Sequence, residues 1–61
     1  MKKYKMTIKP LLDGYRVNVS EYDGVLLDYR LLAFYDYPTE RLAQTEGQAI
    51  VDLMNARVEI T

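Results

Sequence analysis

The 61-residue sequence contains no cysteine and no histidine. Without cysteine it forms no disulfide and offers no thiol nucleophile, and without histidine it has no imidazole base. The same absences exclude the Cys/His zinc sites that stabilise many small domains. The sequence therefore lacks the side chains on which most catalytic centres and structural zinc sites depend.

Glycine and proline are also scarce, with three glycines and two prolines. They form no glycine-rich phosphate-binding loop. No segment approaches the ~20 apolar residues of a membrane span. The start MKKYKMTIKP has no apolar run of the kind that follows the basic residues of a secretory signal. We therefore expect a cytoplasmic protein without a membrane segment.

Carboxylates are the remaining candidates for chemistry. Asp28, Asp36 and Asp52 have no pairing that the sequence identifies, and we interpret them as solvated surface acids. A chain of this length also offers little depth for a pocket that excludes water. We predict a protein that is not an enzyme and that uses no catalytic residue, no metal and no cofactor.

The length predicts one domain, residues 1–61. A chain this short buries only about 60% of the surface that its unfolded form exposes, so its core is small. Small domains without disulfides or metals are stabilised by unusually good packing or by a partner subunit. Both a monomer and a homodimer fit the sequence, and we favour the homodimer.

Asp-Gly occurs twice, at Asp13-Gly14 and at Asp23-Gly24. Asp-Gly between alternating apolar residues is a strong hairpin signal, because type I′ turns need positive φ at both central positions. With Asp13-Gly14 as a two-residue loop, Leu12 faces Tyr15, Pro10 faces Val17 and Ile8 faces Val19. One face then carries only apolar and aromatic residues, which are Tyr4, Met6, Ile8, Leu12, Tyr15, Val17 and Val19. Since Pro10 cannot donate to the ladder, this first strand is expected at an edge of the sheet.

The second turn fits a three-residue loop at residues 22–24, which sets Val19 opposite Leu27, Val17 opposite Tyr29 and Tyr15 opposite Leu31. Leu27, Tyr29 and Leu31 are then expected to face the core. Gly24 then takes the left-handed position of a bulge. The two turns join three strands in a meander and lie at opposite ends of it, too far apart for Asp13 and Asp23 to share a metal ion. Residues 25–35 also carry a helical pattern. The alternatives stay open, with strand favoured.

A helix is expected after Pro38, with Thr39 as its N-cap and Glu40 in its first turn. Gly47 leaves open whether this helix is continuous or begins again at Thr45. The apolar stripe at helical spacing comprises Leu42, Ala43, Ala49, Ile50, Leu53 and Met54. Asn55 is a credible C-cap, and the alternation of Val58 and Ile60 suggests a short fourth strand. The prediction is an α+β domain in which a three-stranded antiparallel meander packs on one C-terminal helix, with the order β-β-β-α and a possible final β.

The sheet face turned away from the helix carries the candidate binding residues. Its predicted members are Lys3, Lys5, Thr7, Lys9, Arg16, Asn18, Ser20, Tyr22, Asp28 and Arg30, together with the apolar Leu26, Leu32 and Phe34. An exposed apolar cluster is typical of a protein interface, for which we select Leu26, Leu32, Phe34, Tyr22 and Arg30. The cations favour an alternative, a nucleic-acid interface made by Lys3, Lys5, Lys9, Arg16 and Arg30. Lysines that only protect an edge strand would give the same pattern.

The segment KYKMTIKPLLDGYRVNV resembles the N-terminal hairpin of HicB-like antitoxins. In that family Lys-Tyr opens the first strand and Asp-Gly-Tyr-x-Val turns into the second. The matching residues are Lys3, Tyr4, Ile8, Asp13, Gly14, Tyr15, Val17 and Val19. The resemblance covers about the first 24 residues. It implies a protein that masks a small RNA-cleaving toxin and does no chemistry itself. Short phage-encoded inhibitors of host enzymes would have a similar sequence, so the chain also resembles this class of small binding inhibitor.

These observations predict a small non-enzymatic protein-binding module, an inhibitor or regulator of antitoxin-like or phage type that covers a surface of its partner. The alternative prediction is a nucleic-acid-binding protein that uses the basic outer face of its sheet.

Overall fold

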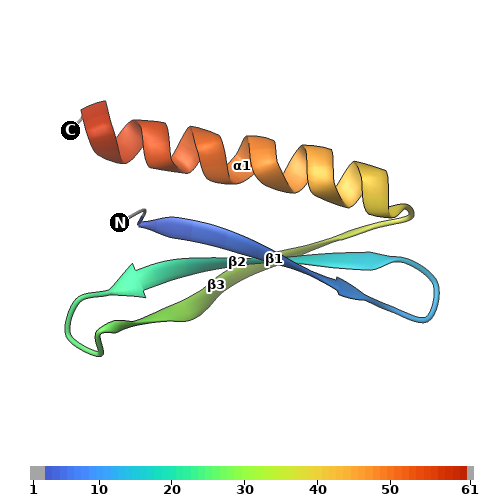
Figure 1. Ribbon diagram of the computed structural model, residues 1–61, viewed down its shortest axis with the longest axis horizontal. Coiled ribbons are helices and arrows are strands. Elements are labelled where there is room, and N and C mark those ends of the chain that lie inside the picture. The colour runs from blue at the N-terminus through green and yellow to red at the C-terminus, as the bar shows by residue number, and fades with distance from the viewer. Residues whose placement is uncertain (1–2, 61) are drawn as a thin grey trace.

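The computed structural model describes residues 3–60, with the side chains of residues 3–58. Three antiparallel strands form a meander in the order β1-β2-β3, and one long helix covers one face of the sheet (Figure 1). The elements are β1 (Tyr4–Pro10), β2 (Tyr15–Asp23), β3 (Asp28–Tyr37) and α1 (Glu40–Ile60). The predicted α+β class and the meander-then-helix order are confirmed.

The first hairpin has the predicted faces but a different register. Met6 pairs with Val19 and Ile8 with Val17, so the pairing is shifted by two residues. A shift of two preserves side-chain alternation, and the apolar residues of β1 and β2 therefore still face the helix. The loop is longer than predicted and is closed by a hydrogen bond that the Leu11 amide donates to the Gly14 carbonyl (2.8 Å). Leu12, predicted to face the core, is fully exposed in this loop.

The Asp-Gly pattern predicted that Gly14 adopts the positive φ of a type I′ turn. This prediction is wrong, because no glycine of the described chain has a positive φ. A Cβ at Gly14 would instead lie 2.6 Å from the carbonyl oxygen of Tyr37. Glycine is required here because the end of β3 lies directly beside the start of β2, where Tyr37 pairs with Tyr15.

The second hairpin also differs from the prediction. Its closing pairs are Tyr22 with Tyr29 and Asp23 with Asp28, and the loop is residues 24–27. The left-handed position is taken by Leu27 (φ 57°) and not by Gly24. The Asp23 carboxylate stabilises the loop by accepting hydrogen bonds from the amides of Val25 (2.9 Å) and Leu26 (3.2 Å).

A β-bulge changes which residues of β3 face outward. Ser20 pairs with Leu31 but its neighbour Val19 pairs with Ala33, so Leu32 is an extra residue in β3. Because one inserted residue reverses the alternation, Leu31 lies on the outer face, whereas Arg30 pairs with Glu21 on the helix side. Residues 28–35 are strand as favoured, but residues 25–27 of the favoured strand belong to the loop, and the predicted faces of residues 28–31 are wrong.

Helix α1 is continuous through Gly47. Thr39 caps it as predicted, because its Oγ1 accepts a hydrogen bond from the Leu42 amide (3.2 Å). Asn55 is not a C-cap, since the helix continues to Ile60. The possible fourth strand is wrong for residues 58–60, which are helical, while Thr61 lies outside the described residues.

The core between α1 and the sheet is small. Its buried members are Val17, Val19, Ala43 and Val51, and its partly buried members are Tyr4, Met6, Ile8, Tyr15, Tyr37, Ile50 and Met54. The chain exposes 4705 Å², whereas a compact monomer of this mass would expose about 4,100 Å². Much of the apolar surface therefore remains outside the core.

Candidate functional site

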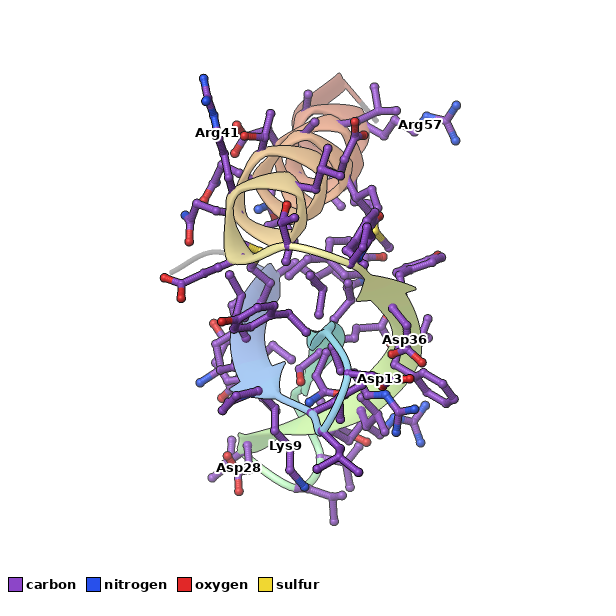
Figure 2. All side chains as sticks on the ribbon, turned by 90° about the vertical axis from the view of Figure 1, so that its right-hand side faces the viewer. Lys9, Asp13, Asp28, Asp36, Arg41 and Arg57 are labelled. Carbon is purple, nitrogen blue, oxygen red and sulfur yellow. The ribbon has the colours of Figure 1, made fainter. Side chains whose placement is uncertain are left out.

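The outer face of the sheet, turned away from α1, is built from alternate residues of all three strands. β1 contributes Lys5, Thr7 and Lys9, and β2 contributes Arg16, Asn18, Ser20 and Tyr22. β3 contributes Tyr29 and Leu31 before the bulge, and Phe34 and Asp36 after it. Lys9 projects from this side of the sheet, away from the helix (Figure 2).

An apolar strip runs along β3 on this face. Leu31 and Phe34 form it, with exposed fractions of 59% and 53%, and Leu32 at the bulge adds a further side chain that is 47% exposed. The structure thus brings two predicted residues, Leu32 and Phe34, together with Leu31, which was predicted to face the core. No sequence signal marked this bulge, so the contribution of Leu31 could not be anticipated.

Leu26, the third apolar residue of the predicted cluster, lies elsewhere. It belongs to the hairpin loop, where Val25, Leu26 and Leu27 are all highly exposed. The predicted cluster is therefore divided into a strip on β3 and an apolar loop at one end of the sheet.

Aromatic rings extend the strip toward β1. Tyr22 and Tyr29 meet edge to face, with ring centroids 5.4 Å apart. The Lys5 ammonium lies 4.0 Å from the Tyr29 ring centroid. These cation–π and edge-to-face contacts hold the side chains in a defined arrangement. Tyr22 is therefore a member of the outer face, as predicted, and Tyr29 joins it because of the bulge.

Arg16 links the strip to the charged part of the face. Its guanidinium lies 4.3 Å from the Phe34 ring centroid and donates two hydrogen bonds to Asp36, at 2.7 and 3.0 Å. The hydrogen bonds from Arg16 hold the pKa of Asp36 below its ordinary value. The sequence predicted no partner for Asp36. Arg16 and Asp36 lie on neighbouring strands, and only the observed register of β2 and β3 places them opposite each other.

Arg30, predicted for both kinds of interface, does not belong to the outer face. It lies on the helix side of the sheet, where its Nε is 3.9 Å from the Asp23 carboxylate. The pKa of Asp23 is lowered, mainly by the amide hydrogen bonds from Leu26 and Val25 and less by Arg30. Arg30 is removed from both predicted sets of binding residues.

The charge of the outer face is lower than the sequence suggested. Lys5, Lys9 and Arg16 remain, and Lys3 is exposed just before β1, opposite Tyr22. Arg16 is neutralised by Asp36, and Asp28, predicted on this face, is on the helix side with Arg30. The cations are thus concentrated on β1, while β3 presents the apolar strip.

The described part of the chain contains no group of three or more Asp, Glu, His or Cys side chains that could hold a metal ion. Asp13 and Asp23 lie in hairpins at opposite ends of the sheet (Figure 1). Within residues 3–60, no helix is long and apolar enough to cross a membrane.

The chain matches no protein-family model, no curated protein and no solved structure.

Proposed function

We propose that this protein is a small protein-binding module that acts by covering a surface of its partner, as an inhibitor or regulator. The observation that carries this proposal is the strip of Leu31, Leu32 and Phe34, which lies exposed on an ordered strand. Contiguous apolar and aromatic surface is typical of protein interfaces, where aromatic residues supply large contact area at low entropic cost.

The apolar loop supports the same proposal. Leu27 is exposed and occupies the left-handed region, which is unfavourable for a branched side chain. Residues in strained conformations cluster at binding sites, where the interaction offsets the strain. We assign Val25, Leu26 and Leu27 to the periphery of the partner contact.

The free chain is also proposed to self-associate as a homodimer. It exposes more surface than a compact monomer of its size, and α1 packs more extensively on β1 and β2 than on β3. As a result Tyr35, in the helix-facing row of β3, and Leu53, on α1, remain exposed. A second copy over this flank would leave the outer face free for another partner.

The resemblance of the first hairpin to HicB-like antitoxins supports an inhibitor of a small toxin enzyme, and a phage-encoded inhibitor of a host enzyme has the same physical requirements. Both assignments place the protein in the cytoplasm. In either case the protein does no chemistry and excludes the substrate of its partner by steric coverage.

Site-specific photo-crosslinking tests the proposal. A photo-reactive residue is placed at Phe34, and in a second variant at Thr45, an exposed position on α1. We expect one discrete protein adduct from the Phe34 position after irradiation of cells, and none from Thr45. Crosslinks to nucleic acid without protein from the Phe34 position would contradict the proposal.

A second candidate function is binding of single-stranded nucleic acid. It is favoured by one observation, that Tyr22, Tyr29 and Phe34 lie on the same face as Lys5 and Lys9. Aromatic side chains beside cations form stacking platforms for bases. This candidate predicts an affinity that falls steeply with salt and is lost on replacing Lys5, Lys9 and Arg16 by alanine. Fluorescence anisotropy with a labelled oligonucleotide distinguishes the two functions.

A further inference from the structure

The free edge of β1 is a second surface, besides the outer face of the sheet, that is available for binding. Within residues 3–60, β1 pairs with β2 on one side and with no strand on the other. The Tyr22 amide donates to the Lys3 carbonyl, so Lys3, Lys5, Thr7 and Lys9 direct their backbone groups toward β2. The intervening residues, among them Met6 and Ile8, therefore direct their N–H and C=O groups to the open edge.

At one end of this edge, Asn55 of α1 acts as a substitute strand. The Tyr4 amide donates to Asn55 Oδ1 (3.0 Å), and Asn55 Nδ2 donates to the Tyr4 carbonyl (3.1 Å). The single Asn55 carboxamide thus makes both of the hydrogen bonds that the backbone of a neighbouring strand would make with Tyr4. At the other end Pro10 has no N–H to offer. The open pairing positions are therefore Met6 and Ile8.

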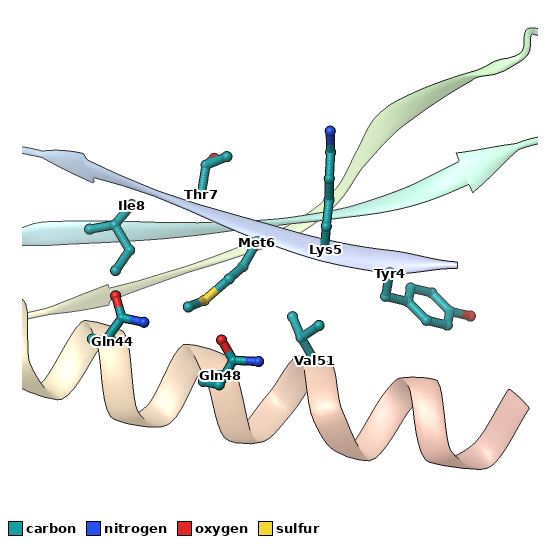
Figure 3. Close-up of a pocket in the computed structure, with 8 residues that line it drawn as sticks. All are labelled: Tyr4, Lys5, Met6, Thr7, Ile8, Gln44, Gln48 and Val51. Atoms are coloured by element: carbon teal, nitrogen blue, oxygen red, sulfur yellow. The ribbon is translucent and has the colours of Figure 1, made fainter. Parts of the chain in front are cut away.

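A groove runs along the same edge, between β1 and α1 (Figure 3). Its volume is about 440 Å³, and its lining includes Met6, Ile8, Gln44, Gln48 and Val51. The side chains of Met6 and Ile8 point toward the helix, whereas those of Lys5 and Thr7 point to the opposite side. A strand added at this edge would place every second side chain in the groove and the others beside the lysines.

The charges on β1 decide which strand fits. Lys5 and Lys9 lie on the side away from α1, so the outward side chains of an added strand meet positive charge. Opposite charges across neighbouring strands stabilise pairing, and like charges oppose it. The β1 strand of a second copy would bring its own lysines to this row, which is unfavourable. The fitting occupant is an extended segment in which acidic and apolar residues alternate.

We propose that the β1 edge binds an extended peptide segment of a partner protein by strand addition, with apolar side chains in the groove and acidic side chains over Lys5 and Lys9. The pairing involves the backbone groups of Met6 and Ile8, and Asn55 and Pro10 set its two limits. This contact uses the edge of the sheet and is independent of the outer-face strip.

The test uses the full chain and a fluorescein-labelled eight-residue peptide in which glutamate and valine alternate. We expect saturable binding by fluorescence anisotropy, with amide chemical-shift changes at Met6, Ile8, Gln44 and Gln48. The same peptide N-methylated at its four central amides cannot pair with the edge, and it is expected to bind about tenfold more weakly or less.

Charge reversal provides the matched comparison. Lys9→Glu should weaken the glutamate–valine peptide about three- to tenfold and strengthen a lysine–valine peptide. Arg41→Glu makes the same change of charge on the solvent side of α1 and should leave both affinities nearly unchanged. Phe34→Ser removes part of the outer strip and should also leave them unchanged, which separates this proposal from the proposed function.

Three results would overturn the inference. They are no binding of the glutamate–valine peptide up to about 1 mM, equal binding of the N-methylated peptide, and shift changes confined to the outer face. A dimer in which the Met6 and Ile8 amides become protected from exchange would assign the edge to a second copy and would equally overturn it.

Discussion

At the tip of the second hairpin, Leu27 adopts a backbone conformation that a nearby glycine does not use. Leu27 has φ 57° and is highly exposed, whereas Gly24 in the same loop has no positive φ. An exposed leucine gains little from burial that could offset the strain. The stability of the free protein is therefore not the reason for a leucine at this position.

Leu27→Gly should raise the free energy of unfolding by about 0.5–1 kcal/mol, because glycine adopts the left-handed region without a Cβ penalty. Urea denaturation followed by circular dichroism measures the change. Leu26→Gly, in the same loop without positive φ, is the control and should not stabilise. A loss of stability in Leu27→Gly would show that the side chain contributes to folding.

The ionisation of Asp36 depends on its hydrogen bonds with Arg16 on the outer face. The hydrogen bonds from Arg16 lower its pKa in the folded state, so the unfolded chain binds the proton more tightly. The contribution to stability is present above the unfolded pKa of about 3.9 and is lost as the pH falls through the lower folded value. Carbon NMR titration should place the pKa of Asp36 below that value, and Arg16→Gln should raise it. An unchanged pKa in Arg16→Gln would contradict this assignment.

At the scale of elements, the packing of α1 depends on one close approach to the sheet. A Cβ at Gly47 would lie 2.5 Å from the Met6 sulfur and 3.0 and 3.1 Å from the two Val17 methyl groups. Val17 is fully buried and cannot move aside. Gly47 lowers the helix propensity of α1, but because it has no Cβ it allows the helix to lie against β1 and β2.

Gly47→Ala should lower the free energy of unfolding by up to about 2 kcal/mol. The overpacking costs about 1–3 kcal/mol, from which the ~1 kcal/mol that alanine gains in helix propensity is subtracted. Gly24→Ala is the matched control, because nothing lies within 4 Å of a Cβ there, and it should be neutral or slightly stabilising. Thermal unfolding of both variants measures the difference. Stabilisation by Gly47→Ala would mean that the helix lies farther from the sheet.

The faces of β1 and β2 were predictable because alternation of apolar residues survives a shift of two in register, as Met6, Ile8, Val17 and Val19 show. The faces of β3 were not, because the bulge at Leu32 reverses the alternation and leucine, tyrosine and arginine are compatible with either side. Leu32 and Phe34 were thus identified from the sequence, but Leu31 and Tyr29 were not.

The role of Asn55 was also beyond sequence reasoning. Its carboxamide pairs with Tyr4, which is 51 residues distant in the chain. From the sequence, an asparagine near the expected end of a helix is interpreted as a C-cap. Its pairing with Tyr4 is seen only in the structure, where α1 runs antiparallel to β1. The groove and the free edge follow from the same long-range arrangement.

At the scale of the whole molecule, the chain buries few of its apolar side chains by itself. Among residues 3–58, the buried apolar side chains are those of Val17, Val19, Ala43 and Val51, and Gly47 is buried with them. A core this small gives limited stability to a domain without disulfides. Association with a second copy or with a partner would supply the missing burial.

Sedimentation at micromolar concentration should therefore give a mass of twice 7.1 kDa, and the unfolding midpoint should rise with protein concentration. Leu53→Glu, on the proposed self-association flank, should shift the protein toward the monomer. Leu12→Glu introduces the same charge at an exposed leucine in the first hairpin loop and should not. A monomer with a concentration-independent midpoint would refute the dimer.

The most direct test of the proposed function is quantitative affinity capture from cells that express three forms of the chain. These are the natural sequence, the double variant Leu31→Ser and Phe34→Ser, and Leu12→Ser as an exposed-leucine control. We expect that the natural chain and the control retain the same protein partner, and that the double variant loses it while remaining folded. Equal retention of that partner by all three forms would contradict the assignment of the outer sheet face as the binding surface.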